Sequence, residues 1–362
     1  MRAWLPELLC GAVLCVILSL GLWPFHVPRN DVTWLPGRDG LHFGRYSTVL
    51  SASEFPLPLE QTSPSASLEV WLQPGRIWDF STILAFYSPN GLARLSLRQW
   101  QLDLRLHAAQ DLQVENVFPR QGWVFLTVTS GSQGITVYVN GIPVRKAPAF
   151  PLPARAFTGR LVLGDAPRQS DSWRGQLFGL ALYHTELDAS EVHSHFLAWT
   201  GRQAPSLLSS NDVSALYLFG EHSGSVTHSS TGAGPDLLIP KNYTVLDQVV
   251  LETPWSEFRR SQDFWGAVVK NIVGFLPFGF CFCAYFTLVR QTRHPMLVTV
   301  LIGTATSLTI EILQAFLPMR DSGMMDIVTN TLGTYLGALG YAVVSPIVHR
   351  FVEDNPLSQT IR

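Results

Sequence analysis

The sequence predicts a mixed fold: an all-β sandwich of two sheets together with an α-helical bundle of four membrane spans. Between residues 67 and 185, short segments alternate apolar and polar side chains, which is typical of strands with one buried face. Only 14% of the 362 residues are charged, whereas a soluble domain usually carries about 25%. Part of the chain therefore lies in lipid, and four apolar stretches have about the length of a membrane crossing: 8–25, 264–289, 296–316 and 327–348.

The first apolar stretch, residues 8–25, is near the lower limit for a span, which needs about 20 apolar residues. A cleaved signal peptide is the alternative interpretation. Because residues 19–25 offer no clean small-x-small cleavage site, we expect an uncleaved anchor within residues 1–29. Trp4 and Trp23 would then lie at the two membrane interfaces, where tryptophan is enriched.

Arginines in the short flanks of the spans predict their orientation, because Lys and Arg are enriched on the cytoplasmic side. They occur before the first span, between the second and third, and after the fourth: Arg2, Arg290, Arg293, Arg350 and Arg362. Four crossings place all of these positions on one side. We therefore expect a multi-pass protein of the inner (plasma) membrane, with both termini and a tail at 351–362 in the cytoplasm and the sandwich outside.

The elements of the sandwich follow from alternation and turn chemistry. The expected strands are 67–73, 100–107, 123–129, 135–139, 160–164 and 176–183. Asn140 and Gly141 both tolerate positive φ and predict a two-residue hairpin turn. Asp188, with Glu191 three residues later, predicts the capped start of a helix over 188–199.

The sandwich is expected to occupy residues 30–205, and residues 206–262 form an extension before the second span. Within this extension, residues 214–224 have the pattern of a strand. Too few residues follow for a second sandwich. The segment is therefore either the completing strand of the one sandwich or a short hairpin resting on the membrane.

The order of these elements resembles the laminin-G-like, concanavalin A-like jelly roll. The resemblance is carried by Glu69-Val-Trp71, by Val-Tyr-Val-Asn-Gly141, by Leu-Val-Leu-Gly-Asp165 and by the closing strand that ends at Tyr183. It covers residues of about 40–200, the usual size of a single domain. The resemblance implies a fold, which is known to host many functions.

Glycan binding is common and calcium is frequent in proteins of that fold, so the resemblance implies both as possible ligands. Asp165 is the one candidate for a metal ligand, although calcium prefers six or more oxygens and no acidic cluster accompanies this aspartate. A turn aspartate is the simpler interpretation. Five tryptophans either stack on sugars or belong to the core: Trp71, Trp78, Trp100, Trp123 and Trp173.

Polar side chains gather near one end of the last three apolar stretches. Charge in hydrocarbon costs several kcal/mol, so such residues are candidates for function. The candidates are Lys270, Asn271, Glu311, Gln314, Arg320, Asp326 and Asn330. With a helical rise of 1.5 Å per residue, Asn271, Glu311 and Asn330 lie within about 10 Å of the outer ends of their spans. The sequence therefore predicts one polar pocket that opens outward beneath the sandwich.

These polar residues also carry a resemblance to the VanZ-like membrane family, over residues 263–350. The matching segments are 270–279, 311–314, Arg320 and 326–333, which occur in the family's order. Members of that family are integral membrane proteins of the bacterial envelope, so the resemblance implies an envelope role. The chain departs from the family pattern by the large sandwich between its first and second spans.

A binding protein is the first of two functional hypotheses. Arg320 and Lys270 would hold a phosphate or carboxylate, since guanidinium groups bind such anions in a bidentate manner. Asn271, Gln314 and Asn330 would supply amide hydrogen bonds. The expected ligand is an anionic lipid-linked or cell-envelope glycan, and the sandwich would contact glycan or an envelope protein. No Lys/Arg run or zinc-type spacing suggests nucleic acid as a partner.

The second hypothesis is a membrane hydrolase or transferase acting on a polyprenyl-linked phosphate. Glu311 and Asp326 would be its acid and base, because carboxyl groups in different environments can take these two roles. No nucleophile–base pair, metal cage or phosphate loop stands out, so we rank this hypothesis second and expect no cofactor. Two weaker alternatives remain: transport, and a Glu311–Arg320 ion pair that only fixes helix packing.

Overall fold

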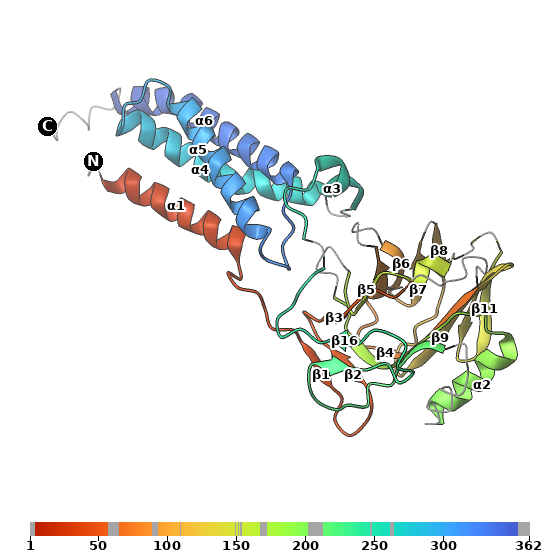
Figure 1. Cartoon of the computed structure of the whole chain (residues 1–362). Helices are drawn as coiled ribbons and strands as arrows, with labels where there is room; N and C mark the ends of the chain where they lie inside the picture. The colour runs from red at the N-terminus through yellow and green to blue at the C-terminus, as the bar shows by residue number, and fades with distance from the viewer. Residues whose placement is uncertain are drawn as a thin grey trace. The chain divides into compact units, whose positions relative to one another are not determined.

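The computed structural model describes residues 4–56, 65–88, 93–108, 110–148, 150, 152, 154–166, 172–201, 213–246, 248–260 and 264–353. The chain divides into two compact units. One unit comprises Val27–Asp247, and the other combines Met1–His26 with Gln248–Arg362. Figure 1 shows the strands of the first unit and the helices of the second. The predicted cytoplasmic tail lies outside the described residues from position 354 onward.

The first unit is a sandwich of two antiparallel sheets. Its first sheet has the strand order β1-β2-β13-β4-β9-β10-β11, with β14 also paired to β13. These strands are β1 (Val32–Trp34), β2 (Leu41–Phe43), β4 (Ala66–Pro74), β9 (Val124–Gly131), β10 (Gly134–Val139), β11 (Ile142–Ala147), β13 (Gly175–Tyr183) and β14 (Val213–Tyr217). The pairing of β4 with both β13 and β9 places this long strand at the centre of the sheet.

The second sheet has the order β15-β16-β3-β12-β5-β6-β7-β8. Its strands are β3 (Val49–Ser51), β5 (Phe80–Tyr87), β6 (Ala93–Trp100), β7 (Asp103–His107), β8 (Asp111–Val114), β12 (Arg160–Leu163), β15 (Val226–Thr227) and β16 (Leu237–Leu238). A short 3-10 helix, η1 (Ala154–Phe157), precedes β12. The two sheets confirm the predicted sandwich.

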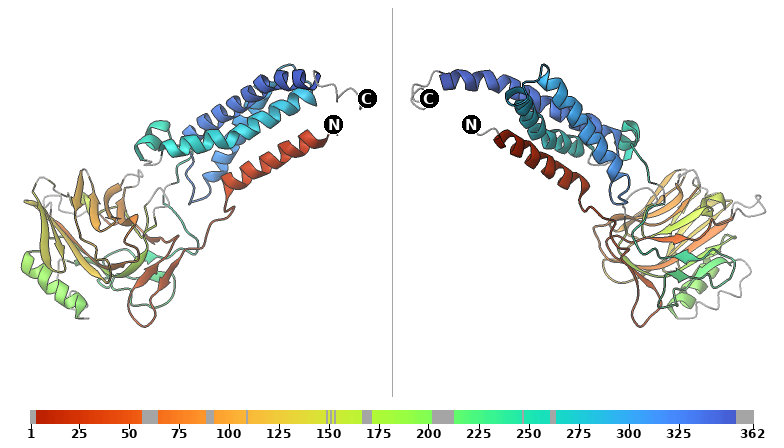
Figure 2. Two further views of the ribbon diagram at one scale, coloured as in Figure 1. Left: turned by 180° about the vertical axis from the view of Figure 1, so that it is seen from behind. Right: turned by 60° about the vertical axis from the view of Figure 1, so that its left-hand side comes forward.

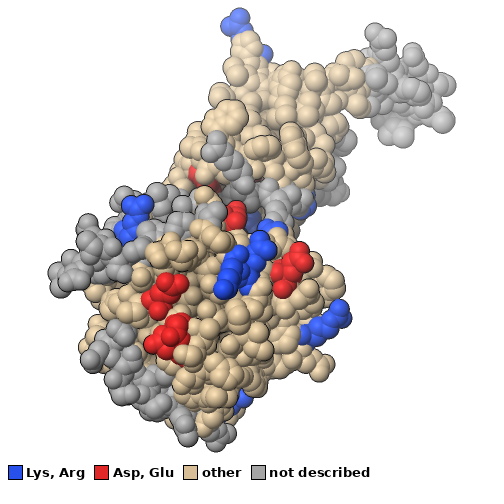
Figure 3. All heavy atoms as spheres, turned by 90° about the vertical axis from the view of Figure 1, so that its right-hand side faces the viewer, with Lys and Arg blue, Asp and Glu red and all other residues tan. Residues whose placement is uncertain are grey.

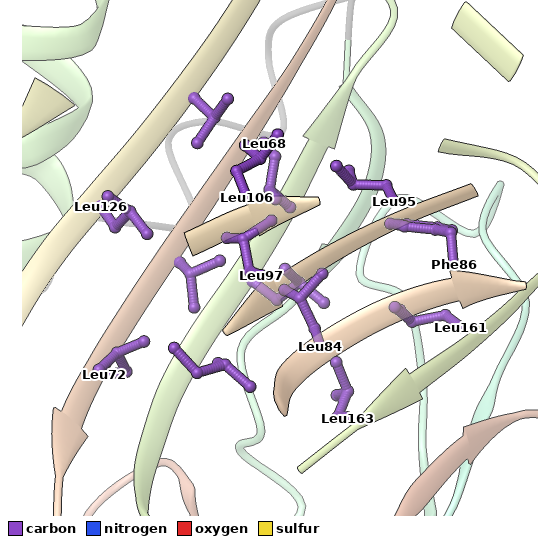
Figure 4. Close-up of a cluster of buried hydrophobic side chains, with 14 of the residues drawn as sticks. Leu68, Leu72, Leu84, Phe86, Leu95, Leu97, Leu106, Leu126, Leu161 and Leu163 are labelled. Atoms are coloured by element: carbon purple, nitrogen blue, oxygen red, sulfur yellow. The ribbon is translucent and has the colours of Figure 1, made fainter. Parts of the chain in front are cut away.

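The core lies between the two sheets, where alternate side chains of the longer strands point inward. Figure 4 shows the leucines of the first sheet facing those of the second. The labelled side chains are Leu68, Leu72 and Leu126 from the first sheet, and Leu84, Phe86, Leu95, Leu97, Leu106, Leu161 and Leu163 from the second. Burial of this apolar area is the main contribution to the stability of the unit.

Helix α2 (Ala189–Thr200) packs on the outer face of the first sheet (Figures 1 and 2). The predicted cap is confirmed: the Asp188 side chain accepts the N–H of Glu191, and the Glu191 carboxylate accepts the N–H of Asp188. Beneath the helix, the fully buried Glu69 carboxylate accepts hydrogen bonds from the Tyr183 hydroxyl (2.7 Å) and the Trp199 indole (3.2 Å). Helix and sheet are thus joined by polar as well as apolar contacts.

Two turns decide where strands begin and end. The hairpin predicted at Asn140 and Gly141 is present, with φ of 52° and 77° at these residues. The strand predicted over 100–107 is confirmed only from Asp103 onward, as β7, because a turn separates β7 from β6, which ends at Trp100. Gln101, with φ of 58°, lies in that turn.

The predicted strand at 214–224 proves to be a completing strand of the sandwich. β14 pairs with β13, and the β15–β16 hairpin extends the second sheet beside β3. The described part of 213–246 therefore belongs to the sandwich unit.

The segments that enter and leave the sandwich unit lie side by side. Arg29 and Asn242 form a β-bridge. The Asn30 amide donates to the carbonyl oxygens of Thr48 (2.7 Å) and Pro240 (2.9 Å). These contacts close the unit at the point where the chain arrives from and returns to the membrane helices.

The second unit is helical, and its helices are α1 (Trp4–Leu22), α3 (Pro254–Arg260), α4 (Phe264–Leu288), α5 (Pro295–Gln314) and α6 (Met324–Glu353). Among described residues, three helices are long and apolar enough to cross a membrane: α4, α5 and α6 as far as Pro346. The fourth predicted span, α1, is a shorter apolar helix. It packs on α4 and α5 through a cluster that includes Ile17, Phe278 and Ile310.

Glycines let α4 and α6 approach closely. A Cβ at Gly333 would lie 2.3 Å from the carbonyl oxygen of Ile272, and one at Gly337 would lie 2.1 Å from that of Leu276. Both distances are far shorter than a van der Waals contact. Gly333 and Gly337 are four residues apart, the spacing of small residues that lets two membrane helices pack closely.

Candidate functional site

Glu311, on the last turn of α5, is 1% exposed. Among the described residues of the second, helical unit, which we call the membrane unit, it is the most deeply buried carboxylate. Its Oε2 accepts the backbone N–H of Gly323 at 2.8 Å. Among described residues, no ion pair joins it to Arg320, so the proposed packing pair is not formed. Instead, Glu311 ties the end of α5 to the loop that leads into α6.

Asp326, on the first turn of α6, is joined to α4. The Asn271 amide donates to the Asp326 carboxylate at 2.7 Å and to the Thr329 hydroxyl at 3.3 Å. Asp326 is only half-buried, whereas Glu311 is almost inaccessible. The two carboxyl groups that the sequence singled out therefore occupy different environments.

A pocket of about 140 Å³ opens beside Asp326. Four carboxylates line it: Glu252, Glu257, Asp321 and Asp326. Apolar side chains of α4, including Phe264 and Val268, form another part of the wall. The pocket is therefore acidic and amphipathic, and it lies where the N-terminal ends of α4 and α6 meet the preceding loops.

The segment before α4 shapes this pocket. Glu252 forms a parallel β-bridge with Gly323, with its N–H donating to the Ser322 carbonyl at 2.8 Å. Ser256 donates to the Glu252 carboxylate at 2.6 Å, and Met325 donates its N–H to Glu257 at 3.4 Å. A Cβ at Gly323 would lie 2.0 Å from Glu257 Oε1, so a side chain at this position would displace the Glu257 carboxylate.

Glu252 and Glu257 were not among the residues predicted from the sequence. Both precede the second predicted span. A carboxylate outside an apolar stretch has no free-energy cost of burial in lipid, so the argument that singled out the other residues does not apply to it. The available signal was the position of Glu257 three residues after Pro254, since acidic residues are favoured in the first turn of a helix.

Gln314 and Asn330 do not line the pocket. The Gln314 amide donates to the Gly21 carbonyl on α1 at 2.7 Å, and the Asn330 amide donates to the Ser307 hydroxyl on α5 at 2.9 Å. Both side chains are buried. Their contacts join helices to one another, as polar side chains in membrane bundles commonly do, instead of serving the ligand-binding role predicted for them.

The two predicted cations lie differently. Lys270 is exposed on α4, and Arg320 is half-buried in the loop between α5 and α6. Arg320 is close enough to act electrostatically on both Glu311 and Asp326. Neither cation is among the described residues that line the pocket.

In the sandwich unit, Asp165 is buried and has a structural setting. Its carboxylate accepts the N–H of Ala166 at 2.7 Å and the hydroxyl groups of Ser172 and Tyr243. Across the part of the chain that the structure describes, no group of three His, Cys, Asp or Glu side chains could hold a metal ion. Asp165 thus fastens the segment that leaves the sandwich.

The five tryptophans considered for sugar stacking divide into three groups. Trp173 belongs to the core and donates to Gln99 at 2.8 Å. Trp71 and Trp100 are half-buried. Trp78 and Trp123 are 75% and 41% exposed, so only these two present large accessible surfaces.

Two family models match the chain. VanZ/LLP1 matches residues 214–345, from β14 through most of α6. The concanavalin A-like lectin/glucanases superfamily (Laminin_G_3) matches residues 44–193, from just before β3 into α2. No curated protein matches.

Similarity to solved structures is low. A proposed carbohydrate-binding protein from Bacteroides ovatus is 13% identical, with a TM-score of 0.39, and the match covers 57% of this chain and 63% of that one. For a Trypanosoma rangeli sialidase the identity is 16%, the TM-score 0.36 and the coverage 47% and 28%. For a pentraxin from Limulus polyphemus the values are 12%, 0.35, 60% and 96%. The chain spans less than two thirds of the length of the first two.

The family matches agree with the architecture of both units. The match to VanZ/LLP1 includes all three helices that are long enough to cross a membrane. The match to the lectin/glucanase superfamily covers most strands of both sheets. The chain is therefore a membrane protein that combines a VanZ-like domain with a concanavalin A-like domain.

Proposed function

We propose that this protein binds the head group of a lipid-linked or cell-envelope glycan in the acidic pocket of its membrane unit, with the sandwich providing further glycan contacts. The observation that carries the proposal is the lining of the pocket by Glu252, Glu257, Asp321 and Asp326 at the ends of apolar helices. Carboxylates accept hydrogen bonds, and sugar hydroxyls donate them. Apolar walls beside the acids suit a ligand that is half sugar and half lipid.

The charge of the pocket refines the predicted ligand. Four carboxylates would repel a bare anion, so the sugar hydroxyls would face the pocket. Arg320 and Lys270, which stand outside the lining, would meet the phosphate of a lipid-linked ligand. The sugar of an anionic lipid-linked glycan would thus contact the pocket carboxylates, and its phosphate would contact Arg320 and Lys270.

We further propose that the protein lies in the inner membrane of a bacterial envelope, with the pocket facing outward. Arg290 and Arg293 precede α5, and Glu311 and Arg320 lie at or beyond its other end. A helix of this length spans about 30 Å. The positive residues of the short turn therefore stand on the opposite side of the membrane from the pocket, as the cytoplasmic enrichment of arginine requires.

Catalysis on a polyprenyl-linked phosphate is the second candidate function, supported by the different environments of Glu311 and Asp326. We rank it second because Glu311 is not among the described residues that line the pocket. An acid and a base must both reach the reacting atoms. Asp326 is placed to do so, and Glu311 is not.

Native mass spectrometry of the full-length protein in detergent tests both candidates, with a polyprenyl-phosphate-linked monosaccharide as the probe. We expect a one-to-one adduct, and Asp326→Asn should reduce its occupancy at least fivefold. Thr309→Ala, at an exposed position on α5, is the control and should leave the adduct unchanged. Absence of an adduct would contradict binding, and conversion of the probe by the wild type but not by Glu311→Gln would favour the enzyme.

A further inference from the structure

An arginine pair lies on the outer face of the second sheet. Arg98 on β6 and Arg105 on β7 are directly opposite each other in the antiparallel ladder. Their neighbours Leu97, Leu104 and Leu106 are fully buried in the core. Because successive side chains of a strand point to opposite faces, Arg98 and Arg105 point outward.

This pairing is unfavourable by itself, because like charges directly opposite each other destabilise a sheet. In the described part of the sandwich, no carboxylate forms an ion pair with Arg105. Asp103, two residues earlier, instead accepts hydrogen bonds from the Gln113 amide (2.8 Å) and the Asn116 N–H (2.9 Å). The sheet therefore holds two adjacent guanidinium groups, and the charge of Arg105 remains available for a ligand.

Aromatic rings hold one of these groups in place. The Arg105 guanidinium lies 3.5 Å from the centroid of the Trp100 ring, a cation–π contact. Phe80 meets the same indole edge to face, with 4.8 Å between ring centroids. Phe80 remains 43% exposed and offers an apolar surface beside the guanidinium.

The pair belongs to a row of polar side chains that crosses four adjacent strands. Thr82 on β5, which is buried, lies opposite Arg98, and Gln113 on β8, whose amide donates to Asp103, lies opposite Arg105. The strand separation spaces these positions by about 4.8 Å, so the row is about 14 Å long. Helix α2 covers the other sheet, and the row is on the face away from it.

We propose that this row binds an acidic polysaccharide, with its sugar carboxylates held by Arg98 and Arg105 and its sugar rings lying against Phe80. Guanidinium groups bind carboxylates in a bidentate manner, and two of them on adjacent strands can hold carboxylates of one polymer. The proposal rests on the glycan-contacting role of the sandwich proposed above. It adds which surface of the sandwich binds the glycan and that the glycan is acidic.

The charges of the molecule favour this partner over nucleic acid. The net charge of the chain is −2. Figure 3 shows acidic and basic side chains interspersed on the face that it presents. Nucleic acids carry a dense row of phosphates and call for an extended basic surface. Two guanidinium groups beside an aromatic ring suit a polymer of lower charge density.

Fluorescence anisotropy with the full-length protein in detergent tests the proposal. The probe is a labelled oligogalacturonate, compared with a neutral glucose oligomer of equal length. We expect the acidic probe to bind at least tenfold more tightly and more weakly as salt increases. Arg98→Gln with Arg105→Gln should reduce its affinity at least tenfold, whereas Arg145→Gln, at an exposed position on β11, should not.

A second variant separates recognition from folding. Arg98→Lys with Arg105→Lys keeps both charges but loses the planar fork, so we expect an intermediate loss of affinity and an unchanged thermal transition. Equal binding of both probes, or an equal loss in Arg145→Gln, would overturn the acidic-glycan inference while leaving a glycan-binding sandwich. If neither probe binds, both the inference and the glycan-contacting role proposed for the sandwich are overturned. Ligand binding in the pocket of the membrane unit is tested independently by the native mass spectrometry described above.

Discussion

Asn330 on α6 donates its side-chain amide to the hydroxyl of Ser307 on α5 at 2.9 Å, and both residues are buried between the two helices. Hydrogen bonds of this kind within a membrane contribute about 0.6 kcal/mol on average and up to about 1.7 kcal/mol. We expect Ser307→Ala to lower the free energy of unfolding by an amount in this range, measured by unfolding in mixed micelles. Thr309→Ala, on the exposed side of α5, serves as the control. A loss as large in the control would contradict a specific contact.

The glycines of α6 offer a matched pair of substitutions. At Gly337 a methyl group would meet the Leu276 carbonyl oxygen at 2.1 Å, whereas at Gly340 nothing lies within 4 Å. Gly337→Ala should therefore force α4 and α6 apart and lower the thermal transition of the purified protein by several degrees. Gly340→Ala should leave it unchanged or raise it, because alanine favours a helix. Similar effects of both substitutions would show that close approach at Gly337 is unimportant.

The buried Glu69 carboxylate is expected to be essential for docking α2. It accepts hydrogen bonds from Tyr183 and Trp199 and lies 3.0 Å from His195 Nδ1. Burial and the neighbouring Glu69 raise the pKa of Tyr183, so its hydroxyl keeps its proton and remains a donor. Glu69→Leu would leave these donors unpaired, each at a cost of about 1–3 kcal/mol.

The measurement for Glu69→Leu is the free energy of unfolding of the sandwich, followed by tryptophan fluorescence. Glu69→Gln keeps an acceptor oxygen and should cost less than Glu69→Leu. Glu115→Leu, at an exposed position, is the control. Equal stability of Glu69→Leu and the wild type would refute the role of this carboxylate.

A pH dependence is expected at His228. The hydrogen bond and charge of Asp236 raise the pKa of this exposed histidine. Because the pKa is higher in the folded state, the stabilising contribution is complete below the unfolded value near 6.5 and is lost as pH rises through the folded value. NMR titration of His228 should show an elevated midpoint that falls in Asp236→Asn. An unchanged midpoint in that variant would reject the pairing.

Alternation of side chains was sufficient to predict strands that have one face in the core, such as β4, β9 and β13. It could not reveal β1, β2 and β3, because three residues are too few to show a period. It also missed β5, which is buried at every position after Phe80 and so presents no contrast between its faces. Burial on both faces is a property of the assembled sheets rather than of the segment.

The site was predictable only in part, for a similar reason. Depth within apolar stretches singled out Asn271 and Asp326, which the structure joins at 2.7 Å. The same argument could not separate pocket residues from packing residues. Gln314 bonds to Gly21, 293 positions away, so its role depends on the docking of α1. Glu252 reaches the pocket through a backbone bridge that leaves no trace in composition.

The bridge between Arg29 and Asn242 has a topological consequence. The two ends of the 221-residue unit Val27–Asp247 lie side by side. The whole domain is therefore inserted between α1 and α4 with its entry and exit segments adjacent. Helices α1 and α4, which are distant along the chain, can then pack together as if a short loop connected them. Replacement of the insert by a short linker from residue 26 to residue 248 should preserve that assembly, which makes this junction suitable for exchanging the inserted domain for another.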